Sequence, residues 1–265
     1  MAAAASFDPR RFRSTAEHYR AGRPDYSPRL IARVASLSGL TQAARVLDLG
    51  CGPGLLAFAF APLAAEVTAI DPEPEMLAAV AQGPSNIRLV QGSSYDLSPA
   101  LGRFRLVVMG RSFHWMDRAE TLRRLDEMIE PGGPVVLFST NQPDVPDNAW
   151  VEEFRALRRQ FAPNDPSHPR LQPGWVHHEA VLLASPFGRL ETASVIERRE
   201  VSVDALAHRA LSTSSSAPAR LGEARARDFA AAVEAMAARH ATRGMIAEVV
   251  ESRALLGFRP GEEPT

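Results

Sequence analysis

The chain has 265 residues, of which 45% are hydrophobic and 23% charged, and its formal net charge at pH 7 is −1. This length accommodates one α/β domain of ordinary size and roughly a hundred further residues. The near-neutral charge excludes a general attraction to nucleic acids or to anionic membranes, so we expect neither as a partner. The composition is that of an ordinary globular protein.

Cysteine content and the chain start indicate the compartment. The single cysteine, Cys51, excludes an intramolecular disulfide and fits a reducing environment. Residues 1–6 lack the charged start and apolar core of a signal peptide. The longest apolar stretch, 55–65, contains Pro62 and is too short to span a bilayer. We therefore expect a soluble cytoplasmic protein, either a monomer or a homodimer.

Residues 1–44 precede the first predicted strand, and we expect them to form a helical N-terminal lid. Within them, Ser27 and Pro28 are typical of a helix N-cap followed by a first-turn proline. The next apolar residues recur at helical spacing: Leu30, Ile31, Val34 and Leu37.

From residue 45 onward, apolar strands alternate with helices. The predicted strands are 45–49, 66–70, 87–91, 104–110 and 134–140, and the predicted helices are 54–64, 73–81 and 118–129. This alternation predicts a doubly wound α/β core over residues 45–140, with a parallel sheet and helices on both faces.

The alternation stops after Ser139. Residues 141–187 are rich in proline and contain one helix with an apolar face of Trp150, Phe154, Leu157 and Phe161, so we expect a helical cap inserted over the active site. We expect residues 188–260 to complete a mostly parallel, seven-stranded sheet. Their predicted elements are a strand at 189–203, helices at 204–212 and 219–241, and a final strand at 246–258, antiparallel to the rest.

The most informative motif follows the first predicted strand. Three glycines, Gly50, Gly52 and Gly54, stand at every second position between that strand and an apolar helical run. Such glycines let a ligand approach main-chain amides that side chains would otherwise shield. Asp71 ends the second strand, where an acidic residue is well placed to bind both hydroxyls of a ribose.

The glycine spacing distinguishes two kinds of nucleoside-binding protein. A dinucleotide fingerprint counted from Gly50 needs its third glycine at position 55, which is a leucine. The pattern D-x-G-x-G-x-G from Asp48 instead resembles the first motif of the class I S-adenosylmethionine-dependent methyltransferases, which have a Rossmann-like fold. The resemblance implies S-adenosylmethionine as cofactor and S-adenosylhomocysteine as product. It implies cofactor contacts from Asp48, Gly50, Cys51, Gly52, Gly54, Asp71, Pro72, Met76, Ser93, Ser94 and Arg111.

Two further segments resemble one subgroup of this family, the type 11-like methyltransferases, whose members mostly act on small molecules. Residues 113–117 match its F-H-W-x-D signature after the fourth strand, and residues 19–26 match its Y-x-x-x-R-P-x-Y segment. The resemblance covers residues 12–140 well. With two cap tryptophans added, the expected substrate-binding residues are Tyr19, Arg23, Tyr26, Phe113, His114, Trp115, Trp150 and Trp175.

His114 is the candidate catalytic residue, since a neutral imidazole can take a proton from a hydroxyl or amine acceptor. The alternative is that His114 only shapes the pocket, because many methyl transfers need little base. Ser93 stands where many family members carry an aspartate for the adenine amino group, and it can still bond the adenine, with the Ser94 amide serving the ring nitrogen. We expect Asp96 to be a helix cap. For Trp115 and Phe113, a wall of the pocket is favoured over a cation–π contact with the sulfonium.

Other chemistries find little support. His168, His177 and His178 lack regular ligand spacing, so no metal is expected. The G-x-S-x-G motif of serine hydrolases is absent. The sequence thus predicts a methyltransferase acting on a small molecule. The alternatives are a protein that binds S-adenosylmethionine without methylating and, fitting the charge less well, a protein or RNA methyltransferase.

Overall fold

The computed structural model describes residues 8–81, 83–162 and 168–262. Its centre is a seven-stranded sheet in the order β3-β2-β1-β4-β5-β7-β6. The strands are β1 (Arg45–Leu49), β2 (Glu66–Asp71), β3 (Ile87–Gln91), β4 (Leu106–Gly110), β5 (Val135–Asn141), β6 (Arg189–Ser202) and β7 (Met245–Phe258). Only β7 pairs antiparallel to its neighbours, and it lies between β5 and the edge strand β6. The prediction of a mostly parallel α/β sheet is therefore confirmed.

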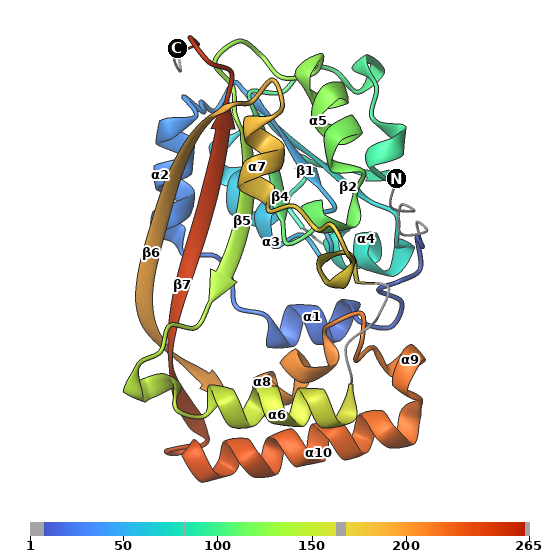
Figure 1. Cartoon of the computed structure of the whole chain (residues 1–265), viewed down its shortest axis with the longest axis vertical. Helices are drawn as coiled ribbons and strands as arrows, with labels where there is room; N and C mark the ends of the chain where they lie inside the picture. Colours follow the sequence, from blue (N-terminus) through green and yellow to red (C-terminus); the bar gives the residue numbers. More distant parts are fainter. Residues whose placement is uncertain (1–7, 82, 163–167, 263–265) are drawn as a thin grey trace.

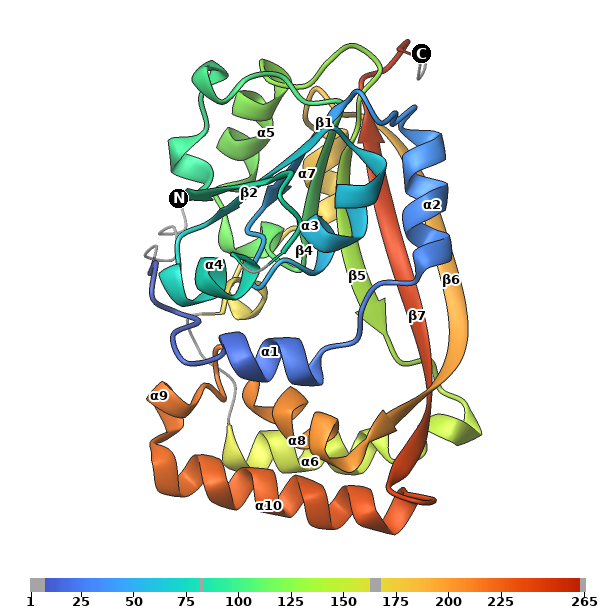
Figure 2. The same cartoon turned by 180° about the vertical axis from the view of Figure 1, so that it is seen from behind.

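Helices cover both faces of the sheet because its central strands are apolar on both sides. On one face, α2 (Pro28–Leu37) and α3 (Leu55–Phe60) pack against Val46, Leu106 and Val108 (Figure 2). On the other, α5 (Arg118–Asp126) and α7 (His178–Leu183) pack against Leu47, Val107 and Leu137 (Figure 1). The remaining helix beside the sheet is α4 (Pro74–Val80).

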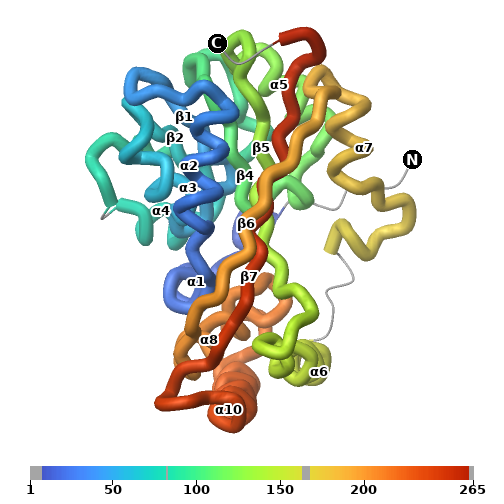
Figure 3. The backbone as a smooth tube through the Cα atoms, turned by 90° about the vertical axis from the view of Figure 1, so that its left-hand side faces the viewer, coloured from blue at the N-terminus to red at the C-terminus, as the bar shows by residue number. Residues whose placement is uncertain are grey.

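A second helical layer lies below the sheet in Figure 1, and it was not predicted from the sequence. It contains α6 (Val151–Phe161), α8 (Val203–Leu211), α9 (Pro218–Leu221) and α10 (Glu223–His240). The strands β6 and β7 are 14 residues long each and run from the sheet down to this layer (Figure 3). Their lower ends contribute Val201 and Ile246 to its separate apolar core. The helices expected to complete the sheet therefore pack with the inserted helix instead.

The expected N-terminal lid divides into two parts. Helix α1 (Ala16–Gly22) lies between the sheet and α8, and its Gly22 packs so closely that a Cβ there would approach the backbone nitrogen of Arg209 to 2.1 Å. Helix α2, in contrast, belongs to the sheet's own core, with Leu30 and Val34 fully buried. Helix α2 is thus part of the domain core and not of a lid.

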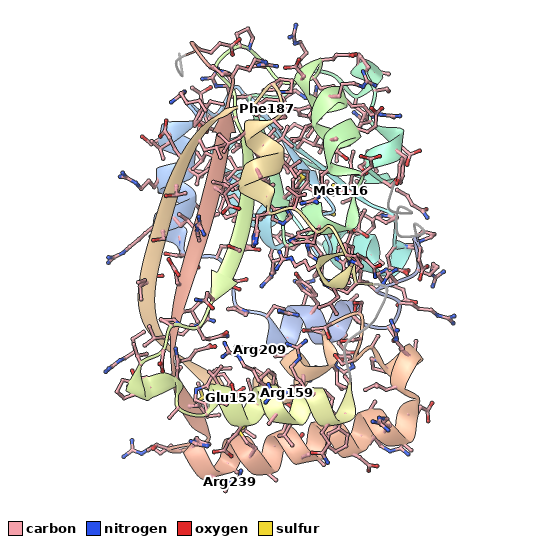
Figure 4. The ribbon with its side chains drawn as sticks, in the orientation of Figure 1. Met116, Glu152, Arg159, Phe187, Arg209 and Arg239 are labelled. Carbon is pink, nitrogen blue, oxygen red and sulfur yellow. The ribbon has the colours of Figure 1, made fainter. Side chains whose placement is uncertain are left out.

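A buried ion pair joins the layers. The guanidinium of Arg209, from α8, donates to both carboxylate oxygens of Glu248 on β7 at 2.5 and 3.2 Å, and to the carbonyl oxygen of Gly22 at 2.9 Å. Figure 4 shows Arg209 in this position between α8 and α1. The upper core and the lower helical layer are therefore connected by satisfied buried charges as well as by the long strands.

Candidate active site

The glycine loop after β1 has the conformation that its sequence predicts. Gly50, Gly52 and Gly54 all have positive φ values, of 69°, 54° and 87°. At Gly50 a side chain would also clash, because an added Cβ would lie 2.5 Å from the Cβ of Ser112. The loop is tied to β2, since the amides of Gly50 and Cys51 both donate to the carbonyl oxygen of Ile70, at 2.8 and 2.9 Å.

Asp71 lies beside this loop at the end of β2 and is 8% exposed. One carboxylate oxygen accepts from the amide of Gly52 at 2.8 Å, and the other from the amide of Glu73 at 2.9 Å. Burial raises the pKa of this carboxyl, and the two amide bonds oppose that shift. Each carboxylate oxygen has a second lone pair, so both remain able to accept from a pair of ribose hydroxyls.

A main cavity opens between the glycine loop, Asp71 and the end of β4, with a volume of about 130 Å³. Of the predicted cofactor residues it is lined by Gly50, Cys51, Gly52, Asp71, Pro72, Met76, Ser93, Ser94 and Arg111. Gly54 and Asp48 stand behind this surface: Gly54 precedes α3, and Asp48 accepts from the amide of Ala57 at 2.9 Å. The structure thus brings most of the predicted cofactor residues together around one space.

Ser93 and Asp96 form a local cap at the floor of this cavity. The Asp96 carboxylate accepts from the amide and the hydroxyl of Ser93, at 2.7 and 2.9 Å, while the Ser93 hydroxyl oxygen accepts from the amide of Tyr95. Asp96 is a cap, as the sequence predicted. The Ser93 hydroxyl is therefore already engaged in this cap, and Ser94 beside it is buried.

A narrow recess of about 10 Å³ extends from the main cavity beneath Tyr19, bounded by Asp48, Tyr26 and Arg111. Three buried polar atoms among the described residues lack partners here: Oδ1 of Asp48, the hydroxyl of Tyr26 and Nε of Arg111. Burial raises the pKa of Asp48 to about 8, despite the hydrogen bond from Ala57. The guanidinium of Arg111 also donates from NH1 to the Thr140 hydroxyl at 3.2 Å. A carboxyl, a phenol and a guanidinium that each keep one unpartnered atom here form a site suited to a zwitterionic amino-acid group.

Arg111 holds an unusual backbone conformation at the end of β4. Its φ is 59°, in the left-handed region that residues other than glycine seldom adopt. Its guanidinium lies 5.3 Å from the ring centroids of both Tyr19 and Tyr26. Burial lowers the pKa of Arg111, but the phenols of Tyr19 and Tyr26 outweigh that effect, so its pKa is raised and the side chain stays charged.

The segment before α1, which is part of the predicted N-terminal lid, lines the main cavity. Asp8, Pro9, Arg11 and Phe12 line it together with Tyr19. Arg10 holds this segment to the cofactor side, because it donates to the buried Glu73 at 2.9 Å and to Glu75 at 3.3 Å. Trp115 also lines the cavity, with Arg11 stacked 4.6 Å from its ring centroid. Trp115 thus forms part of the wall of the main cavity.

His114 and Phe113 do not line the main cavity. They line a second cavity of about 280 Å³ on the far side of Arg111, together with Trp175 and His178. Burial, and then the positive charge of Arg170, holds the pKa of His114 well below its usual range. Its Nδ1 is buried without a partner among the described residues. His114 is therefore neutral. Arg111 lines both cavities.

Two predicted substrate residues lie elsewhere. Trp150 is 2% exposed in the core of the lower helical layer, and its indole nitrogen donates to the carbonyl oxygen of Ala247 at 3.1 Å. The structure does not bring it to either cavity, because the apolar face of α6 is used to pack that layer. Arg23 lies behind Tyr19, where its Nε donates to the Ser212 hydroxyl at 2.8 Å. Burial, and then the charge of Arg111, lowers its pKa to about 9.

Sequence reasoning missed Arg170 and His178 as cavity residues. Both precede or begin α7, in the part of the 141–187 segment that packs over the second cavity rather than in the lower layer. The prolines at 163 and 166 lie outside the described residues. No group of three or more metal-binding side chains occurs in the described parts of the chain. None of their helices combines the length and apolar character needed to cross a bilayer.

The fold and this site define an α/β protein with a nucleoside-type cavity on a glycine loop. A family model described as a methyltransferase domain matches residues 46–133. This matched segment, together with the fold, supports a class I S-adenosylmethionine-dependent methyltransferase.

Comparisons with individual proteins agree with this family. Uncharacterized methyltransferase Rv3342 of Mycobacterium tuberculosis is 30% identical over 145 residues, which are 54% of this chain and 56% of the relative. Trans-aconitate 2-methyltransferase of the same species is 34% identical over 141 residues, covering 52% of this chain and 49% of that protein. The chain thus spans about half the length of these relatives.

Solved structures share the fold. One from Anaeromyxobacter dehalogenans has a TM-score of 0.58 and 19% identity, covering 89% of this chain and 97% of that one. The YcgJ protein of Bacillus subtilis has a TM-score of 0.51 and 18% identity, covering 89% of this chain and all of that one.

Proposed function

We propose that this protein transfers the methyl group of S-adenosylmethionine to a small-molecule acceptor. The observation that carries the proposal is that the cavity at the glycine loop and Asp71 adjoins the Asp48–Tyr26–Arg111 recess, with Gly50, Cys51 and Arg111 lining both. The sulfonium of the bound cofactor supplies an activated methyl group, whose bond to sulfur breaks with the electron pair staying on sulfur as the bond to the acceptor forms.

Each part of the cofactor has a matching group. Asp71 binds the ribose hydroxyls, and the amide of Ser94 bonds the adenine. In the recess, the unpartnered Asp48 oxygen binds the ammonium, while Arg111 and the Tyr26 hydroxyl bind the carboxylate. This assignment supplies partners for all three buried polar atoms that otherwise lack them. The residues therefore fit the cofactor that the family uses.

The acceptor lies in the second cavity, on the other side of Arg111. Phe113, His114 and Trp175 line this space, so part of the predicted substrate set is found there. We expect Pro9, Arg11 and Phe12 to exclude water from the cofactor side, and such exclusion with correct positioning supplies most of the rate for an activated donor. A small acceptor is supported by the relative named trans-aconitate 2-methyltransferase and by the near-neutral charge of the chain.

Calorimetry tests the cofactor assignment. S-adenosylmethionine and S-adenosylhomocysteine should bind with comparable affinity, and Asp71→Ala should weaken binding by about 1–3 kcal/mol because the ribose loses its acceptors. The exposed Asp144→Ala serves as the matched control. A cofactor analogue without the ribose 2′-hydroxyl should bind the wild type more weakly, yet lose little further affinity in Asp71→Ala. Tight NAD binding with no response to S-adenosylhomocysteine would refute the assignment.

The alternative is a protein that binds the cofactor without transferring its methyl group. Incubation with S-adenosylmethionine and a panel of small hydroxyl, carboxyl and amine compounds separates the two. A methyltransferase releases S-adenosylhomocysteine with at least one of them. Cofactor binding without release across a broad panel would favour the alternative.

A further inference from the structure

The second cavity has an excess of hydrogen-bond donors over acceptors. Arg170 and His178 line it, and Arg118 stands directly behind, with its guanidinium 3.9 Å from the ring centroid of Trp175. Among the described residues, the only carboxylate that lines it is Glu179, which is paired with Arg253 at 3.5 Å. Within the described residues, neither Arg170 nor Arg118 has an acidic partner. The cavity therefore carries uncompensated positive charge.

The position of His178 shows where an acceptor is missing. Its Nδ1 lies 3.4 Å from NH1 of Arg118, and its Nε2 lies 3.4 Å from NH2 of Arg170. A neutral imidazole has one acceptor nitrogen, so it can accept from only one of these two donors. Burial, and then the charges of Arg170 and Arg118, lowers the pKa of His178 to about 4, so the ring is neutral at neutral pH. One guanidinium donor thus faces an N–H group that cannot accept from it.

The bound cofactor does not remove the imbalance. Its carboxylate pairs with Arg111 in the proposed assignment, but its ammonium and its sulfonium leave it with a net positive charge. That charge lies next to a cavity that already holds Arg170 and Arg118. Like charges close together in a partly buried site repel one another more strongly than they would in water. An anion in the second cavity would offset these charges and supply the missing acceptors.

The remaining walls limit the size and kind of that anion. Apolar side chains of Met109, Leu137 and Leu255 line one part of the cavity, and the rings of Phe113 and Trp175 another. A ligand for this space has a short apolar body and at least one negatively charged oxygen group. We propose that the methyl acceptor is a small organic acid in its carboxylate form, bound in the second cavity with a carboxylate on Arg170. This inference rests on the proposed function and names its substrate class.

Calorimetry on protein saturated with S-adenosylhomocysteine tests the proposal with defined probes. Succinate, tricarballylate and benzoate are compared with their neutral amides, succinamide, tricarballylamide and benzamide. At least one acid should bind about tenfold or more tightly than its amide, since a hydrogen bond between charged groups in such a site gives a preference of this order. Amides that bind as well as their acids, or acids that do not bind at all, would overturn the proposal.

Variants then assign the binding to Arg170. Arg170→Gln should weaken binding of the acid by about tenfold to a hundredfold and leave the affinity for the amide unchanged. Arg170→Lys should restore part of the affinity for the acid. Arg29→Gln, an exposed arginine distant from both cavities, is the matched control. Equal affinity for the acid in Arg170→Gln and wild type would contradict the assignment. If the wild type did not bind S-adenosylhomocysteine, the proposed function itself would be refuted. Failure of the substrate class and failure of the proposed function are therefore distinguishable.

Discussion

The main cavity and the second cavity meet at Arg111, yet they are assembled in different ways. The main cavity is built largely from backbone amides and the carboxylates that hold them, on the ends of β1, β2 and β3. The second cavity is built from side chains on β4, β5, β7 and the segment before α7. Recognition by backbone groups depends on glycines and caps close together in the sequence, whereas recognition by side chains depends on how distant segments pack. The comparison suggests that a change in the first should impair cofactor binding, and a change in the second only acceptor binding.

The largest effect expected is on stability, from a tryptophan that belongs to neither cavity. Trp150→Ala should lower the free energy of unfolding by about 3–5 kcal/mol, because the side chain is almost fully buried in the lower helical core. Chemical denaturation measures this loss. Calorimetry on the folded variant should show unchanged affinity for S-adenosylhomocysteine. The milder Trp150→Phe serves if the alanine variant does not fold. Weakened cofactor binding in a folded variant would show that the helical layer contributes to the site.

Variants at two glycines of the loop distinguish the stability loss caused by backbone strain from the loss caused by a close contact. Gly50→Ala should cost about 2–4 kcal/mol, since its positive φ strains an alanine and the new Cβ would overlap Ser112. Gly52→Ala has similar strain, but its Cβ would have only the Met76 sulfur at 4.0 Å, so about 1–2 kcal/mol is expected. Thermal denaturation of both variants checks the difference. Equal losses would mean that the contact with Ser112 does not matter.

The sequence predicted the main cavity better than the second because of this difference in construction. Gly50, Gly52 and Asp71 lie within one β–loop–α–β segment, so their spacing alone places them together. The five parallel core strands and the antiparallel β7 were likewise predicted from apolar runs. The amphipathic pattern of α6 showed that Trp150 faces a core, but a helical pattern does not say which core. Arg170 and His178 lie in no recognisable sequence motif, so the sequence could not predict that they lie near Arg111.

Cofactor binding should also change the dynamics of the covering segment. Residues 8–14 are held over the main cavity chiefly by Arg10 and Ser14, which bond Glu73 and Glu75, whereas α1 packs firmly against α8. The amide hydrogens of residues 8–14 should exchange quickly in the free protein and more slowly with S-adenosylhomocysteine, as a closing lid does. Strand β5 provides an internal control because it is buried in both states. The same exchange rate in residues 8–14 with and without ligand would contradict a lid.

The smallest expected effect concerns acid stability at the second cavity. The pKa of His178 is lowered to about 4, so the unfolded chain takes up a proton at a higher pH than the folded chain does. Stability from this group is therefore full above the unfolded pKa of about 6.5 and is lost as the pH falls toward 4. His178→Gln should reduce the drop in melting temperature between pH 7 and about 4.5. An identical drop in the variant and the wild type would show that His178 does not control it.

The central claim is that a cofactor site and an anion-binding acceptor site adjoin at Arg111. Titration of S-adenosylhomocysteine into Asp48→Asn and Arg170→Gln tests it most directly. Asp48→Asn should weaken binding by about tenfold to a hundredfold, because the ammonium loses a charged acceptor. It should also stabilise the free protein at pH 7–8, since the raised pKa of Asp48 makes its charge unfavourable there. Arg170→Gln should bind S-adenosylhomocysteine like the wild type. Equal weakening in both variants, or none in Asp48→Asn, would contradict the account.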